Sequence, residues 1–190
     1  GEVVVFFFQA EDGRRDYDVT GVQTWALLIC KAQKTYWALV MGNPRPTEGV
    51  LELPLVKRGV GDREMIVPAE KGDKDADPAE TEFVNISRAG PRAAWMALRP
   101  HTGRTHQLRA HMKAMGHPIL GDPKYGDEAS AQLSGLLKLQ LHARRLTLPH
   151  PSSGMLILEA PLSPEMKAGF ARFGFDEHEA DPEPFGRKRR

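Results

Sequence analysis

The stretch Arg99–Gly126, RPHTGRTHQLRAHMKAMGHPILGDPKYG, carries the densest local pattern in this 190-residue chain. Its middle part, Thr105–Met115, predicts a helix, because apolar residues recur there every three or four positions and form one stripe. These residues are Leu108, Met112 and Met115. Gly116 follows at the position where a glycine commonly ends a helix. The flanking residues are rich in glycine and proline and predict loops, at Pro100–Arg104 and Pro118–Gly126.

The start of this predicted helix combines free backbone donors with positive charge. The first turns carry Thr105, His106 and Gln107, directly after Arg104. A helix start presents unpaired N–H groups and the positive end of the helix dipole, which together suit a phosphate or a carboxylate. The pattern therefore predicts an anion-binding, substrate-contacting segment.

Arg109 and Asp122 are the charged residues that stand out further along. Arg109 follows Leu108, at the border of the apolar stripe, where its planar fork can pair with a buried carboxylate. Asp122 lies in the following loop, and we expect it to brace that loop through backbone hydrogen bonds. A metal-hydrolase site built from His106, His111 and Asp122 is the rival hypothesis. The five-residue spacing of the two histidines puts them on different sides of a helix, so we expect no metal.

The rest of the chain predicts several hairpin-like strands and few helices. Runs of branched and aromatic residues predict strands at Lys34–Met41, Val50–Leu55, Glu64–Val67, Thr81–Ser87, Ala93–Arg99, Leu139–Leu148 and Met155–Ala160. Pro164–Phe173 predicts a last helix, and the charged segment Asp176–Arg190 predicts a disordered tail. The expected fold class is α+β, with a mixed, largely antiparallel sheet.

The net charge is only +1, so bulk charge does not indicate a nucleic-acid partner. Basic residues nevertheless gather at Arg99–Lys113, Arg144–Arg145 and Arg187–Arg190. A local basic surface of this kind can meet phosphate in a near-neutral protein. The single Cys30 excludes an internal disulfide framework and fits the cytoplasm. The apolar opening Val3–Phe8 is too short to span a membrane, so we expect no membrane partner.

Three stretches together resemble the RluA-type RNA pseudouridine synthases. HTGRTHQLRAHMKAMGHPILGDPKYG is similar to the family's T-G-R-[TS]-H-Q-[IL]-R-x-H and G-x-P-I-x-G-D-x-x-Y signature. KTYWALVMGNPRPTEGVLELPL resembles its K-x-Y strand and the linker after it. LQLHARRLTLPHP and LEAPLSPEM resemble its closing regions. The resemblance runs from Lys34 to Phe175 in the family's own order, and it is most like the subgroup that acts on large-subunit ribosomal RNA.

The resemblance implies a reaction and roles for several residues. Such enzymes detach uracil from its ribose, turn it and rejoin it through carbon, with one aspartate as nucleophile or base and no metal or organic cofactor. Tyr36 matches the tyrosine that stacks on the target uracil and helps to remove the proton at its C5, and Arg109 matches the arginine that pairs with the catalytic aspartate. Leu141 and His142 match residues that line the site. The implied partner is RNA, whose target base must leave its stack.

The family's His-Arg-Leu-Asp motif is missing upstream of Tyr36. Val3–Cys30 stands in its place and resembles translated sequencing-adapter sequence. A forced overlay puts Asp16 on the catalytic aspartate. We therefore divide the chain into a non-family segment (1–30), a partial, N-terminally truncated catalytic domain (31–175) and a charged tail (176–190). The expectation is a monomeric pseudouridine synthase whose activity is impaired, and the alternative is a catalytically dead RNA-binding module of the same fold.

Overall fold

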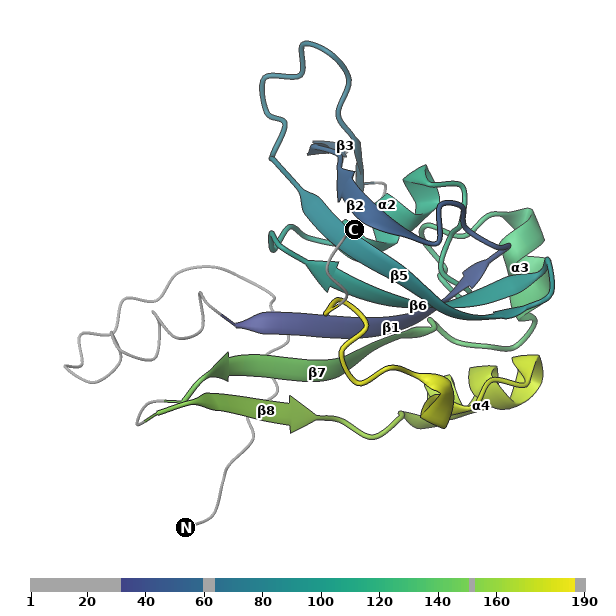
Figure 1. Ribbon diagram of the computed structural model, residues 1–190. Helices are drawn as coiled ribbons and strands as arrows, with labels where there is room; N and C mark the ends of the chain where they lie inside the picture. The colour runs from purple at the N-terminus through teal and green to yellow at the C-terminus, as the bar shows by residue number, and fades with distance from the viewer. Residues whose placement is uncertain (1–31, 60–63, 151–152, 187–190) are drawn as a thin grey trace.

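The computed structural model describes residues 32–59, 64–150 and 153–186, and these form a largely antiparallel sheet flanked by helices (Figure 1). The strands are β1 (Gln33–Met41), β2 (Glu48–Glu52), β3 (Leu55–Arg58), β4 (Met65–Pro68), β5 (Glu80–Ala89), β6 (Ala93–Pro100), β7 (Leu141–Pro149) and β8 (Met155–Glu159). The helices are α2 (Gln107–Ala114), α3 (Glu128–Ser134) and α4 (Pro164–Phe173), with the 3-10 turn η2 at Glu177–Glu179. Six strands pair in the order β2-β5-β6-β1-β7-β8, and β3 pairs with β4 in a separate ribbon.

β1 lies near the middle of the sheet and is covered on both faces. Successive side chains of a strand point to opposite faces, so its residues divide into two sets. Ala38 and Val40 belong to one buried cluster, and Trp37 and Leu39 belong to another. The unbroken apolar run of β1 is the pattern expected of a strand buried on both sides.

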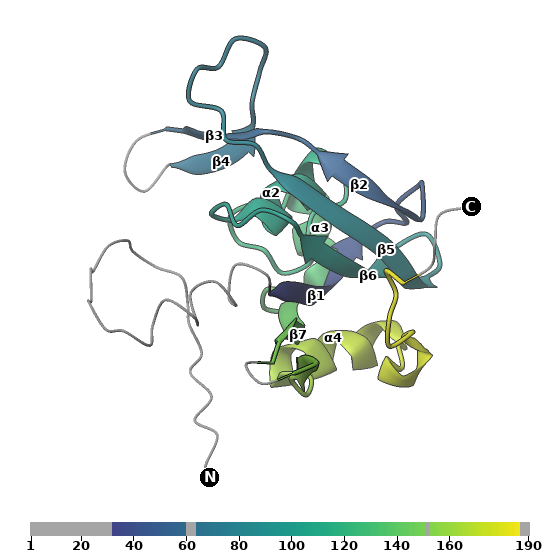
Figure 2. The same cartoon turned by 60° about the vertical axis from the view of Figure 1, so that its left-hand side comes forward.

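Helices cover the two faces of the sheet (Figure 2). On the first face, Leu108 and Met112 of α2 join the cluster that contains Ala38 and Val40. On the second face, Met166 and Phe170 of α4 pack against Trp37 and Leu39. We call these the α2 face and the α4 face. None of the helices in the described residues is long and apolar enough to cross a membrane.

The predicted elements agree with the structure except at four places. α2 begins at Gln107 rather than Thr105, because His106 adopts a left-handed conformation with φ 51°. The expected strand Val50–Leu55 divides at Leu53 and Pro54 into β2 and β3. α3 was not predicted; Asp127 caps it by accepting a hydrogen bond from Ser130 N.

The fourth difference concerns the tail, which we expected to be disordered from Asp176 onward. Residues 176–186 are instead placed against the α4 face, and Ala180 and Phe185 pack against its buried cluster. The reason is that this charged segment also carries apolar side chains, and its glutamates pair with arginines of the sheet. Arg187–Arg190, Val3–Cys30 and Asp16 lie outside the described residues.

Candidate active site

A buried ion pair joins α2 to the loop after it. Arg109 donates from Nε to Asp122 Oδ2 at 2.8 Å and from Nη2 to Asp122 Oδ1 at 2.6 Å. The Asp122 side chain is 0% exposed and that of Arg109 is 15% exposed. Burial raises the pKa of Asp122, but the Arg109 guanidinium and two backbone N–H groups outweigh it and hold that pKa below its ordinary value. Asp122 is therefore a carboxylate, and the predicted pairing of Arg109 with a buried carboxylate is present.

Asp122 also braces its own loop, as the sequence predicted. Its Oδ1 accepts hydrogen bonds from Lys124 N at 2.9 Å and Tyr125 N at 3.0 Å. The Arg109 guanidinium lies over the Tyr125 ring, 4.9 Å from the ring centroid. Tyr125 is 2% exposed, and its hydroxyl accepts a hydrogen bond from Ile66 N and lies 3.2 Å from His106 Nδ1. We predicted no role for Tyr125, although it is the tyrosine of the G-D-x-x-Y signature.

The loop before α2 is held by the buried side chain of Gln107. Its Oε1 accepts hydrogen bonds from Thr102 Oγ1 and Arg104 N, at 2.7 and 3.0 Å. Its Nε2 donates to Glu80 O and Thr81 Oγ1, at 2.8 and 3.0 Å. The amide oxygen and both amide hydrogens of this side chain are thus bonded within the protein. Gln107 therefore fixes the loop relative to β5.

His111 extends the same network on α2. Its Nε2 lies 2.9 Å from Leu53 O and its Nδ1 lies 2.9 Å from Thr81 Oγ1. A carbonyl can only accept, so Nε2 carries the proton and Nδ1 accepts from the Thr81 hydroxyl. Burial lowers the pKa of His111, which keeps the ring neutral. No three histidine, cysteine, aspartate or glutamate side chains are grouped to hold a metal within the residues that the structure describes.

Tyr36 lies on the α2 face. Its side chain packs at the margin of the cluster that contains Leu108, the residue before Arg109, and Leu141 lies at the same margin. The pairing of β1 with β7 shifts between Thr35 and Tyr36, and bulges of this kind often re-aim a side chain beside a functional site. Burial raises the pKa of Tyr36, so its phenol is neutral at physiological pH.

The helix-start residues are the more exposed part of this face. Arg104 and Thr105 are exposed, and no side chain caps the N-terminus of α2. Arg104 donates from Nε to Pro78 O at 3.1 Å and forms an ion pair with Asp77 at 3.2 Å. His106 is half-buried against Tyr125. An incoming phosphate would therefore compete with Asp77 for Arg104.

His142 is the predicted site residue that the structure separates from the others. It pairs with Trp37 in the β1–β7 register, whereas Leu141 pairs with Ala38. Directly opposite residues share a face, so His142 lies on the α4 face and Leu141 on the α2 face. Burial lowers the pKa of His142. The site brought together on the α2 face comprises Tyr36, Arg104, Thr105, His106, Gln107, Arg109 and Leu141, with Asp122 and Tyr125 added.

The chain is similar to known RNA pseudouridine synthases. Residues 30–114 match the family model described as RNA pseudouridylate synthase. The dual-specificity RNA pseudouridine synthase RluA of Escherichia coli (strain K12) is 44% identical over 123 residues, which cover 64% of this chain and 53% of that protein. The ribosomal large subunit pseudouridine synthase C of Pasteurella multocida (strain Pm70) is 42% identical over 140 residues, covering 71% of this chain and 41% of that protein.

Solved structures show the same fold. Human RNA Pseudouridylate Synthase Domain Containing 4 superposes with a TM-score of 0.63 at 26% identity, covering 81% of this chain and 66% of that one. The fold and the matched residues are thus similar to those of RNA pseudouridylate synthases. The sequence relatives include enzymes named RluA and ribosomal large subunit pseudouridine synthase C. The chain spans about half the length of the curated relatives that it matches first.

Proposed function

We propose that the α2 face serves the isomerisation of uridine to pseudouridine in structured RNA, and that large-subunit ribosomal RNA is the substrate class. The supporting observation is that Tyr36 and the Arg109–Asp122 pair, which come from two separate signature stretches, lie on the same face of the sheet. The relatives named for RNA and for the large ribosomal subunit support the choice of substrate. The proposal treats the protein as a cytoplasmic monomer without a cofactor.

Tyr36 acts in this proposal by stacking on the base. A phenol whose pKa is raised by burial is a poor proton acceptor at neutral pH, but it remains a flat apolar surface with one donor. Such a surface suits an unstacked pyrimidine, which loses stacking in the RNA and regains it in the protein. Leu141, at the same cluster margin, would lie along the edge of the bound base.

Arg109 acts by holding charge next to the base. Asp122 occupies its Nε and Nη2, so the orientation of the guanidinium is fixed before substrate arrives. A second carboxylate or a ribose oxygen would approach through Nη1. Preorganised positive charge of this kind costs no reorganisation during reaction. Arg104 and Thr105 at the start of α2 would contact the backbone phosphate that flanks the target.

We expect this chain to convert uridine to pseudouridine weakly or not at all. The signature that should carry the aspartate is missing, and the carboxylate that pairs with Arg109 in the described residues is Asp122. Asp122 is fully enclosed and already paired, which leaves it unsuited to attack a base. The second candidate function is therefore an RNA-binding module of the same fold. For conversion, the sequence overlay offers Asp16 as the catalytic aspartate.

The test is to incubate the chain with ribosomal RNA and map pseudouridines by a chemical stop assay. Arg109→Lys removes the two-pronged geometry and should lower conversion by about 100-fold, whereas Arg88→Lys, at an exposed arginine of β5, should leave it unchanged. Conversion by the unaltered chain that is abolished in Asp16→Ala would assign the aspartate. Binding of RNA without any conversion would favour the second candidate, and the absence of both would refute the proposal.

A further inference from the structure

Three arginines of the central strands gather on the α4 face, away from the site described above. Arg145 of β7 pairs with Thr35 of β1, and Arg99 of β6 follows Leu98, which pairs with Tyr36. Arg99, Thr35 and Arg145 therefore lie side by side on three adjacent strands. The third arginine, Arg144, lies over the Trp37 ring at 4.5 Å from its centroid. We call Arg99, Arg144 and Arg145 the arginine row.

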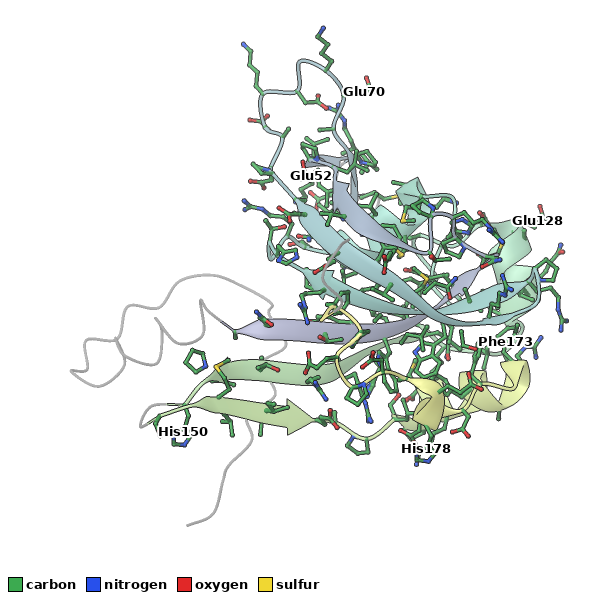
Figure 3. The ribbon with its side chains drawn as sticks, in the orientation of Figure 1. Glu52, Glu70, Glu128, His150, Phe173 and His178 are labelled. Atoms are coloured by element: carbon green, nitrogen blue, oxygen red, sulfur yellow. The ribbon has the colours of Figure 1, made fainter. Side chains whose placement is uncertain are left out.

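The chain's own acidic C-terminal segment covers this row. Residues 176–186, which we call the strap, leave α4 and cross in front of β1 (Figure 1). Glu177 lies 3.7 Å from Arg144, and Glu183 forms an ion pair with Arg145, which also pairs with Glu159 of β8 at 2.5 Å. Phe185 places its ring 4.2 Å from the Arg99 guanidinium. His178, labelled in Figure 3, marks the turn η2 at the start of the strap.

The strap does not fully satisfy the arginines. The Nε of Arg99 is buried and has no hydrogen-bond partner among the described residues. The two strap carboxylates remain 36% and 59% exposed, and ion pairs this exposed are weak. A cavity of about 190 Å³ remains between the strap and the sheet, lined by Thr35, Trp37, Arg144 and Arg145 among others. The contact is therefore a loose one that another anion can replace.

The chemistry of the row selects the kind of anion. Guanidinium forks match phosphate oxygens in two-pronged hydrogen bonds, and a phosphate offers more acceptors than a carboxylate. Trp37 is buried beneath Arg144 and holds that guanidinium over the sheet by a cation–π contact. A single small anion would meet one arginine, whereas a polyphosphate backbone can follow all three.

We propose that the arginine row is a second RNA-backbone contact, and that the strap covers it as an acidic mimic that RNA displaces. The proposal depends on the proposed function only for the choice of RNA as the polyanion. It adds a surface on the α4 face, opposite Tyr36 and Arg109. The strap then lowers the affinity of the chain for RNA, because RNA must compete with Glu177 for Arg144 and with Glu183, besides Glu159 of β8, for Arg145.

The test is the salt dependence of binding to a labelled single-stranded RNA oligonucleotide, measured by fluorescence anisotropy. Glu177→Gln/Glu183→Gln should bind about tenfold more tightly at low salt. Its slope of log affinity against log salt should steepen by about 1.4, as expected for two additional phosphate contacts on a single strand. Adding Arg145→Gln to this variant should cancel most of the gain.

The matched control is Glu52→Gln/Glu70→Gln, which removes two exposed carboxylates elsewhere (labelled in Figure 3). It should change affinity less than twofold. Equal tightening in both double variants, or no tightening in the strap variant, would overturn the proposal. If the strap variant does not fold, Glu177→Gln alone should still steepen the slope by about 0.7, and an unchanged slope would overturn the proposal equally. Pseudouridine mapping is a separate readout, so failure of conversion with a retained strap effect refutes only the proposed function.

Discussion

Arg109 and Asp122 are joined by two parallel hydrogen bonds of 2.8 and 2.6 Å across a separation of 13 residues. The aspartate also accepts two backbone hydrogen bonds, from Lys124 and Tyr125. One carboxylate thus holds the helix, the loop and the ring that lies under the guanidinium. The pair therefore fixes the orientation of the arginine on which the proposed function depends.

Asp122→Ala is expected to destabilise the protein by about 3 kcal/mol, because it leaves a largely buried guanidinium unpaired and two loop N–H groups unsatisfied. The measurement is the free energy of unfolding from urea denaturation. Asp75→Ala, at an exposed carboxylate of the β4–β5 connection, should change it by less than about 0.5 kcal/mol. Equal stability of the two variants would show that the Arg109–Asp122 pair contributes nothing to the fold.

His111 should make the protein less stable in mild acid. Burial lowers the pKa of His111 below its ordinary value of 6.5. Between the lowered pKa of the folded state and 6.5, the unfolded chain therefore binds more protons than the folded chain. Stability then rises with pH wherever the unfolded state holds the extra proton. The contribution of His111 is therefore complete above its ordinary pKa and is lost as pH falls below it.

The measurement is the free energy of unfolding between pH 5 and pH 8, roughly the range in which histidine titrates. His111→Gln should be less stable than the unaltered chain near neutral pH, and the difference should shrink toward acid. His178→Gln, at an exposed position in η2, should follow the unaltered curve. A constant difference between His111→Gln and the unaltered chain across this range would contradict the buried, neutral assignment.

The sequence predicted α4 to the residue and missed α3, and the contrast has a physical basis. α4 begins after Ser163, which accepts a hydrogen bond from Met166 N, and ends at Gly174 in a left-handed conformation. A capping serine before the helix and a glycine after it can both be recognised in the sequence. α3 has the sequence EASAQLS, with one leucine and no apolar stripe, and its stability comes from the Asp127 cap and tertiary contacts.

The site shows a second limit of reasoning from motifs. Leu141 and His142 are neighbours in one signature, and the resemblance assigned both to the site. Neighbouring residues of a strand point to opposite faces, and the register puts only Leu141 beside Tyr36. The arginine row could not be predicted either, because Arg99 and Arg145 meet only when β6, β1 and β7 are placed side by side.

Gln107→Leu tests the loop that leads into α2. Leucine has a similar volume but removes all four hydrogen bonds of the Gln107 side chain. Arg104 N loses its partner, whereas Glu80 O still accepts from His101 N and Thr81 Oγ1 still bonds His111. A buried polar group left unsatisfied costs about 1–3 kcal/mol, so the expected loss is about 2 kcal/mol. Urea denaturation measures the change, and Gln132→Leu on α3, whose side chain bonds only an exposed glutamate at 3.4 Å, is the control. A loss no greater than that of the control would contradict the proposed role of Gln107 in holding the loop.

Gly169→Ala tests the packing of α4 against the sheet. Alanine is favoured over glycine inside a helix by about 1 kcal/mol, so propensity alone predicts stabilisation. At this position, however, a Cβ would overlap Gln140 Oε1 and lie 2.7 Å from Leu39 Cδ1. Gln140 cannot retreat freely, because its Nε2 donates to Lys138 O and Glu165 O. Overpacking typically costs about 1–3 kcal/mol, which outweighs the gain in propensity.

The expected result is a net loss of up to about 2 kcal/mol in the free energy of unfolding, obtained by urea denaturation. Ala168→Gly, at the preceding exposed position of α4, measures the propensity effect in the same helix and should cost about 1 kcal/mol. The two substitutions exchange the same residue types in opposite directions, so propensity predicts opposite signs. A loss in both variants is expected if Gln140 and Leu39 lie too close to Gly169 to admit a methyl group, whereas stabilisation by Gly169→Ala would show that this packing is wrong.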